Sequence, residues 1–133
     1  MAKGYETNQE RLAVLSSFGK DLARRAKSRC ELCEASGVKL SIYEVPPVPR
    51  EPDFGICAFL CENCLEHADH PKRFVAGESW RFLTQSLWSE VPALQALSLR
   101  LLRRQADSQA WAREALEDAW VDPAIEEWAA REK

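Results

Sequence analysis

The sequence has neither a long apolar run nor an excess of positive charge. No stretch approaches the roughly 20 apolar residues that a helix needs to cross a bilayer, and the N-terminal region lacks the apolar segment and small-residue cleavage site of a signal peptide. The 133 residues include 21 acidic and 18 basic ones. Such a chain has no overall field that would attract a polyanion. We therefore expect a cytoplasmic protein with no membrane contact, and nucleic-acid binding is disfavoured.

The motifs of common enzymes are missing as well. The chain contains no glycine-rich phosphate loop, no nucleophile elbow and no HExxH metalloprotease motif. The sequence therefore assigns no catalytic residue, and a non-enzymatic protein is favoured. At 133 residues the chain has the common size of a single compact domain.

A long helical pattern occupies the N-terminal segment, residues 1–29. Thr7 and Glu10 have the spacing of a capping box, and apolar side chains then recur at helical intervals as far as Ala26. The pattern predicts one helix from about residue 8 to residue 27, weakened at Gly19. Its outer face is expected to carry basic residues, namely Lys20, Arg24, Arg25 and Lys27.

Short segments with β character follow in residues 30–70. Residues 39–45 alternate and are rich in β-branched and aromatic side chains, so they predict a strand, and residues 56–60 predict a second one. Four prolines between Pro46 and Pro52 exclude regular structure from the connection. We expect the two strands to pair as an antiparallel hairpin with a long proline-rich loop.

Helical signals return beyond Pro71 and continue through the C-terminal region, residues 71–133. Apolar spacing predicts a helix near residues 79–89, and Ser89 is placed to cap a second helix whose first turn holds Pro92. Two further helical patterns follow, the last one starting at Pro123. The region is thus expected to form three to four helices.

All five tryptophans fall in this C-terminal region. Exposed aromatic rings can stack on nucleic-acid bases, but rings at helical spacing among leucine and alanine are typical of a core. We expect the helices to pack as one apolar unit with most of these rings buried: Trp80, Trp88, Trp111, Trp120 and Trp128.

Four of the five cysteines form two CxxC pairs. Cys30 and Cys33 are separated by 27 residues from Cys61 and Cys64, and the predicted hairpin fills that interval and returns the second pair to the first. Paired CxxC turns supply four thiolates at tetrahedral corners, which is the preferred shell of structural zinc. A disulfide in an oxidising compartment or a redox CxxC is the alternative, but a redox motif occurs singly beside a βαβ pattern that is missing here. Because four thiolates leave no position open for water, we expect one structural zinc ion.

Three nearby residues carry alternative roles. Cys57 lies on the second predicted strand, where a free cysteine usually packs as a small apolar residue. His67 and His70 follow Cys64 at three-residue intervals, so either could replace a cysteine as a ligand or line a second site. We favour core packing for Cys57 and a solvent-facing or hydrogen-bonded position for the histidines.

Several segments resemble a known family. CELC from Cys30, LSIYEVPP from Leu40, LCENC from Leu60 and WRFLTQSLWSEVPALQ from Trp80 are similar to the N-terminal region of proteobacterial PhnA proteins, which take their name from an alkylphosphonate-utilisation operon. The likeness covers most of residues 22–128. It implies a zinc-ribbon-like domain followed by helices, and it supports the four paired cysteines as ligands. PhnA members usually continue into a small C-terminal β domain that this sequence lacks, so any activity of that domain is not carried over.

The order of CxxC, strand, loop and second CxxC is also similar to that of treble-clef proteins, including HNH nucleases. Their catalytic histidines fall at the end of the first strand, where this chain has residues 43–47 and no histidine. The similarity therefore implies a scaffold without a nuclease site.

Together these observations predict an α+β protein with a zinc-ribbon or treble-clef-like hairpin, an N-terminal helix and a C-terminal helical region, in which the hairpin packs against several helices. We expect a binding or regulatory module with an unknown protein partner. Two other functions stay open. One is an enzyme or accessory protein of organophosphonate metabolism. The other is weak nucleic-acid binding through the basic residues Lys20, Arg24, Arg25, Lys27 and Arg29.

Overall fold

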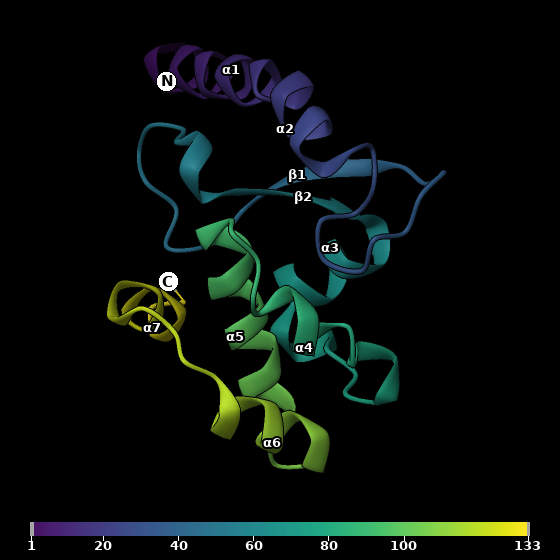
Figure 1. Cartoon of the computed structure of the whole chain (residues 1–133). Coiled ribbons are helices and arrows are strands. Elements are labelled where there is room, and N and C mark those ends of the chain that lie inside the picture. Colours follow the sequence, from purple (N-terminus) through teal and green to yellow (C-terminus); the bar gives the residue numbers. More distant parts are fainter. Residues whose placement is uncertain (1, 133) are drawn as a thin grey trace.

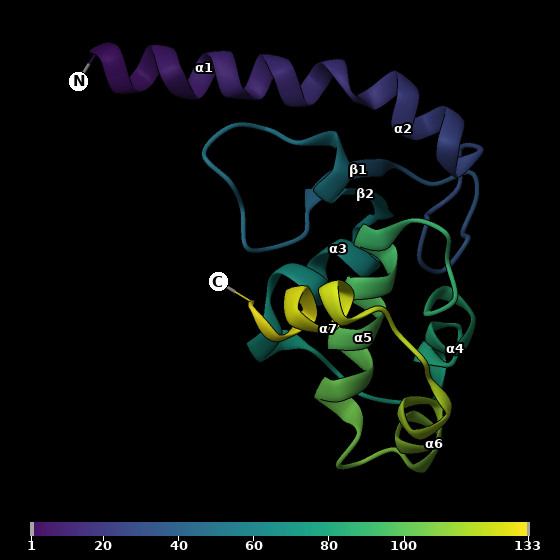
Figure 2. The same ribbon diagram turned by 60° about the vertical axis from the view of Figure 1, so that its left-hand side comes forward.

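A small antiparallel hairpin lies between two sets of helices. The computed structural model describes the backbone of residues 2–132 and the side chains of residues 8–132. Helices α1 (Ala2–Ser17) and α2 (Gly19–Ala26) run end to end along the outer side of the hairpin, and the C-terminal helices lie on its other side (Figure 1 and Figure 2). The mixture of helices with one two-stranded sheet agrees with the predicted α+β class.

The N-terminal segment forms two helices rather than the single one that the sequence predicted. The amide of Phe18 donates to the carbonyl of Leu15 (3.0 Å) in a tight turn that separates α1 from α2. Gly19, the position expected to weaken the helix, begins α2, and Lys27 ends it with a φ of 56° in the left-handed region. The predicted start at residue 8 is also wrong. Since no proline interrupts the upstream residues, α1 already begins at Ala2.

The predicted hairpin is present, with bounds close to those expected. Strands β1 (Leu40–Glu44) and β2 (Cys57–Cys61) pair antiparallel, with Leu40 opposite Cys61 and Glu44 opposite Cys57. The proline-rich connection contains a cis peptide bond between Pro46 and Pro47 and ends in a 3₁₀ turn at Phe54–Ile56. The hairpin therefore carries the chain from the first cysteine pair to the second.

Helix α3 (Glu62–Asp69) follows β2 without a loop. The helix predicted near residues 79–89 is much shorter, because the chain there forms a 3₁₀ turn at Glu78–Trp80 and then one turn of α-helix. Ser89 accepts a hydrogen bond from the amide of Val91 (3.1 Å) before the next helix begins, and so it is not the predicted cap. The remaining helices are α4 (Leu83–Ser86), α5 (Pro92–Gln105), α6 (Ala110–Asp118) and α7 (Pro123–Ala130).

One apolar cluster connects the hairpin with the C-terminal helices. Val45 and Leu60 from the hairpin region are fully buried together with Leu97 and Leu101 of α5. Helix α5 contacts β2 as well as α4, α6 and α7, and it occupies the middle of the helical region in Figure 1. The segment with the cysteine pairs therefore shares its core with the helices. Among residues 2–132, no helix combines the length and the apolar character that crossing a bilayer requires.

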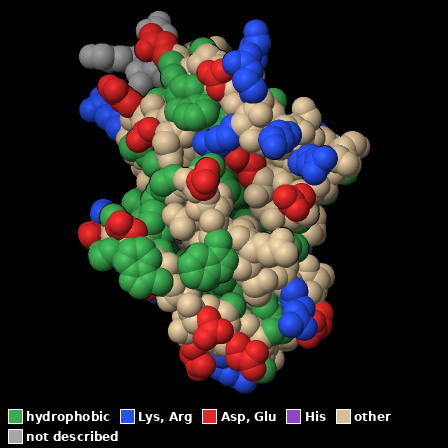
Figure 3. Space-filling model, viewed as in Figure 1, with side chains coloured by type: hydrophobic (Ala, Val, Ile, Leu, Met, Phe, Trp, Pro, Cys, Tyr) green, Lys and Arg blue, Asp and Glu red, His purple; other side chains and the backbone are tan. Residues whose placement is uncertain are grey.

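The expectation that most of the tryptophans would be buried was wrong, since Trp128 is only partly buried and two others are exposed. Trp80 and Trp111 are buried, whereas the exposed fractions of Trp88 and Trp120 are 58% and 75%. The shortness of α4 leaves Trp88 in a turn, and Trp120 lies in the connection after α6, so neither is held on the inner face of a helix. Figure 3 shows one face of the molecule, where apolar side chains alternate with charged ones and acidic groups gather at the end formed by α6.

Candidate metal centre

One loop and one strand–helix junction bring the four paired cysteines together. Cys30 and Cys33 lie in the irregular segment after α2, Cys61 is the last residue of β2, and Cys64 lies in the first turn of α3. Their four sulfur atoms all lie within 4.8 Å of one another. The sequence expectation that these residues form one group is therefore met by the geometry, and the group could hold a metal ion.

The sulfur spacing distinguishes a metal shell from a disulfide. The Sγ atoms of Cys33 and Cys61 are 3.7 Å apart. A disulfide needs a separation of about 2.05 Å. Four sulfurs held at about 2.3 Å from one zinc ion at tetrahedral corners would be about 3.8 Å apart. All five cysteines of the chain are free thiols.

The first cysteine turn is shaped by its own backbone. The amide of Cys30 donates to the carbonyl of Ala35 (2.9 Å), and the amide of Glu34 donates to the carbonyl of Cys30 (2.9 Å). Glu34 and Gly37 have φ values of 65° and 69°, so the chain reverses through left-handed positions. An isolated β-bridge between Arg29 and Ser36 closes the loop that contains the two cysteines.

The second cysteine pair is placed by the junction of a strand and a helix. Cys61 is the N-cap of α3, and its sulfur accepts a hydrogen bond from the amide of Cys64 (3.5 Å). The backbone at the start of α3 therefore holds the Cys61 sulfur in place beside Cys64.

A carboxylate between the first two cysteines links the loop to the hairpin. The backbone amide of Glu31 donates to the carbonyl of Phe59 (2.9 Å), and the carboxylate of Glu31 accepts from the amide of Phe59 (2.9 Å). Arg25 of α2 binds the same carboxylate through Nε (2.8 Å) and Nη2 (2.6 Å). Glu31 thus fixes the cysteine loop on β2, a role that the sequence did not reveal, because a charged residue inside a CxxC turn is ordinarily solvated.

Burial and charge make the four thiols interdependent. Cys30, Cys61 and Cys64 are buried, and Cys33 is partly exposed. A hydrogen bond between the thiols of Cys30 and Cys64 lowers the pKa of Cys30 and raises the pKa of Cys64. Burial raises the pKa of Cys33 to about 11. Four thiolates this close need a cation to neutralise them, so a bound divalent ion would displace the protons that remain.

The other sulfur and imidazole groups lie outside this cluster. Cys57 is buried at the far end of β2, where its thiol donates to the carbonyl of Asp53 (3.4 Å) and burial raises its pKa to about 11. His67 on α3 has Nδ1 at 2.9 Å from the carbonyl of Asn63, and its ring packs edge-on against Trp80. His70 is exposed just beyond α3. The structure therefore joins none of these three groups to the four paired cysteines.

The predicted basic face of the N-terminal segment is not continuous. Arg25 turns inward, donating to Glu31 and to the carbonyl of Cys57 (2.9 Å), and its guanidinium lies over the ring of Phe54 at 5.3 Å. Arg24, in contrast, is exposed and lies 3.8 Å from Asp21. Arg25, which was expected on the outer face, therefore binds groups of the cysteine loop and the hairpin instead.

Comparisons of the chain with protein-family models, with curated proteins and with solved structures find no match. The chemistry of the four clustered thiols is therefore the basis on which a function can be proposed.

Proposed function

We propose that this chain binds one structural zinc ion through Cys30, Cys33, Cys61 and Cys64 and acts as a zinc-stabilised binding or regulatory module. The observation that carries the proposal is the meeting of four sulfur atoms within 4.8 Å of one another. Soft thiolate ligands select zinc over the harder cations that prefer oxygen. The resemblance of the cysteine segments to PhnA proteins supports the same ligand set.

A structural rather than a catalytic ion fits the ligand set best. Catalytic zinc keeps one coordination position for water or substrate, whereas four thiolates complete the shell. Three of the four cysteines are also buried, and Cys33 is the most exposed of the four. An ion at this place would connect the loop that holds Cys30 and Cys33 with the N-terminus of α3. The surface beside Cys33 would remain available to a protein partner.

The test compares two cysteine variants with the wild-type chain purified with zinc. Native mass spectrometry should find one zinc per chain in the wild type and in Cys57→Ser, because Cys57 lies outside the cluster. Cys64→Ser removes a buried ligand and should lose most of the bound zinc.

X-ray absorption at the zinc edge gives an independent measurement on the wild-type chain, where four sulfur neighbours at about 2.3 Å are expected. Nitrogen or oxygen in the first shell would refute the proposed ligands. So would loss of zinc from Cys57→Ser, or full retention of zinc by Cys64→Ser.

A further inference from the structure

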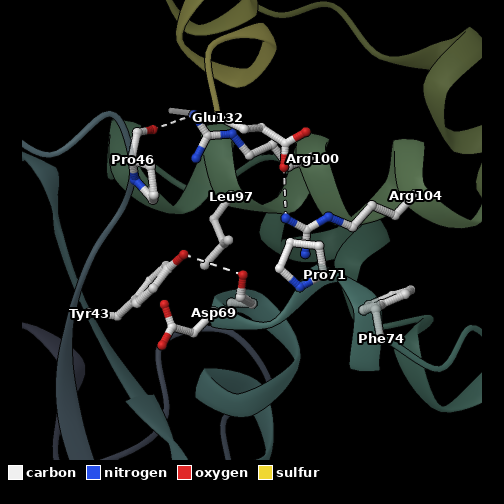
Figure 4. A pocket seen from close by; sticks show the side chains of 10 residues that line it. Tyr43, Pro46, Asp69, Pro71, Phe74, Leu97, Arg100, Arg104 and Glu132 are labelled. Atoms are coloured by element: carbon white, nitrogen blue, oxygen red, sulfur yellow. Dashed lines mark hydrogen bonds and ion pairs between the residues drawn. The ribbon is translucent and has the colours of Figure 1, made fainter.

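A cavity of about 540 Å³ lies at the far end of α3 from the cysteine cluster. Its walls come from the end of β1, the C-terminal end of α3 and the inner side of α5, and Figure 4 shows the side chains that line it. Tyr43, Arg100 and Arg104 supply its hydrogen-bond donors, and Phe74 and Leu97 contribute apolar surface. None of these residues belongs to the proposed zinc site.

Arg100 is a buried charge in the leucine-rich face of α5, with an exposed fraction of 3%. Its Nε donates to the carbonyl of Ala129 (3.0 Å), and its Nη2 donates to the carbonyls of Trp128 (2.6 Å), Arg131 (2.7 Å) and Pro46. These bonds hold the C-terminal end of α7 and the proline-rich loop against α5. Every one of these acceptors is a neutral carbonyl.

The charge of Arg100 therefore has no direct counterion in the described part of the chain. Residues 8–132 place no carboxylate oxygen within 4.0 Å of its guanidinium, and Nη1 has no hydrogen-bond partner among them. Figure 4 shows one guanidinium nitrogen turned into the cavity, toward Tyr43 and Leu97. A guanidinium buried among neutral groups is costly, and burial lowers the pKa of Arg100. An anion in the cavity would offset this cost.

Two further donors face the same space. Arg104 lies one helical turn beyond Arg100 on α5, and its guanidinium binds the carboxylate of Glu132 (2.7 Å) and the carbonyl of His67 (3.2 Å). The hydroxyl of Tyr43 makes only a long bond of 3.4 Å to the carbonyl of Ala68. Burial raises the pKa of Tyr43 to about 12, so its hydroxyl keeps its proton at neutral pH and can donate to an anion.

The acidic residues of the cavity do not cancel this charge. Glu132 is paired with Arg104, and the carboxylate of Asp69 is 58% exposed, so solvent screens it. The least hydrated charge at the cavity is that of Arg100. Charges interact more strongly where water is excluded. The guanidinium therefore makes the inner part of the cavity favour a ligand with a negative charge.

We propose that this cavity binds a small organic anion whose carboxylate or phosphate group lies against Arg100, Arg104 and the hydroxyl of Tyr43. Its apolar part would contact Phe74 and Leu97. The cavity has room for such a molecule, since ligand sites commonly enclose about 300–1,000 Å³. Carboxylate and phosphate oxygens share the geometry that arginine binds, so the experiment must separate the two groups.

The test titrates the zinc-loaded full chain with benzoate, phenyl phosphate and the neutral isostere benzamide, and calorimetry and amide NMR shifts report binding. We expect saturable binding of at least one anion, at least about tenfold tighter than benzamide. The tighter of the two anions identifies the carboxylate or the phosphate group as the preferred head.

Variants locate the site, and Arg100 itself is left intact because it also holds α7. Tyr43→Phe keeps the ring and should weaken anion binding by about three- to tenfold, as the loss of one neutral donor predicts. Arg104→Gln should weaken it by about tenfold or more, whereas Arg103→Gln, on the exposed side of the same helix, should leave it unchanged.

The proposal fails if neither anion binds saturably, or if benzamide binds as tightly as the anions. It also fails if Tyr43→Phe binds like the wild type. Should Arg104→Gln unfold, Tyr43→Phe alone decides, because that change removes only a hydroxyl.

Discussion

Glu31 connects three parts of the molecule through one side chain. Its carboxylate, only 6% exposed, accepts hydrogen bonds from Arg25 on α2 and from the amide of Phe59 on β2, while its own backbone lies between two of the clustered cysteines. A buried ion pair contributes little when compared with an apolar replacement, but breaking one partner leaves the other charge uncompensated. Loss of the charge of Glu31 should therefore lower the stability of the fold more than loss of the charge of an exposed acid.

Replacing Glu31 by Gln should lower the free energy of unfolding of the zinc-loaded protein by about 2 kcal/mol, since Arg25 then lacks its counterion. Asp21→Asn is the matched control, because the pair of Asp21 and Arg24 is long at 3.8 Å and both side chains are more than 60% exposed. The control should cost about 0.5 kcal/mol or less. Urea denaturation followed by circular dichroism measures both. Equal costs for the two variants would show that the Glu31 bridge is not maintained in solution.

At the scale of elements, α2 is held to the hairpin by very little apolar surface. Leu22 is the only residue of α2 that is buried, with no exposed area, and the helix contacts β2. Removing most of a fully buried leucine side chain typically costs about 2–5 kcal/mol, because transfer energy is lost and a cavity is left behind.

Leu22→Ala should therefore reduce the free energy of unfolding by about 3 kcal/mol, with bound zinc still at one per chain because no ligand is changed. Leu12→Ala on α1 serves as the control, since Leu12 is 53% exposed and should cost about 0.5 kcal/mol or less. The same denaturation assay, with zinc measured by mass spectrometry, reports both results. If Leu22→Ala is no more costly than Leu12→Ala, then α2 does not pack on β2 as described.

The elements that local patterns define were predicted well, and those that depend on distant contacts were not. Alternating residues and prolines are local signals, so β1, β2 and the proline starts of α5 and α7 were found. Gly19 marked the weak point between α1 and α2, but it did not show that the helix would divide there, and the shortness of α4 has no strong local marker. Trp88 and Trp120 were misjudged because helical spacing was assumed where the chain turns.

The same distinction applies to the candidate sites of the whole molecule. The four cysteines were identified from spacing alone, because two CxxC turns carry their own geometry. Arg100 was not singled out, although a charge inside an otherwise apolar stretch of α5 is a visible signal. Its role depends on carbonyls of α7 and of the loop at Pro46, which are far from it in the sequence. Side-chain contacts of this kind follow only from the packed structure.

Removal of the metal should unfold one part of the molecule and leave another part folded. The loop from Cys30 to Ala35 has no helix or strand of its own. Its two cysteines meet the second pair through thiol contacts and the proposed ion, and Glu31 joins the loop to β2. Structural zinc in small modules contributes about 10 kcal/mol or more of apparent binding free energy near neutral pH. A two-stranded hairpin is at best marginally stable by itself. Helix α5, by contrast, is buried among α4, α6 and α7.

Chelation should therefore remove hydrogen-exchange protection from residues 30–36, from β1 and β2 and from the first turn of α3, while α5 stays protected and most of the helical circular dichroism remains. Exchange mass spectrometry of the zinc-loaded and chelated protein measures this, and adding zinc back should restore the protection. Hairpin amides that stay protected without metal would mean that the shared core with α5 suffices to hold β1 and β2. The ion would then have a role other than stabilising the fold, and the exposed edge of the cluster at Cys33 would be the place to look for it.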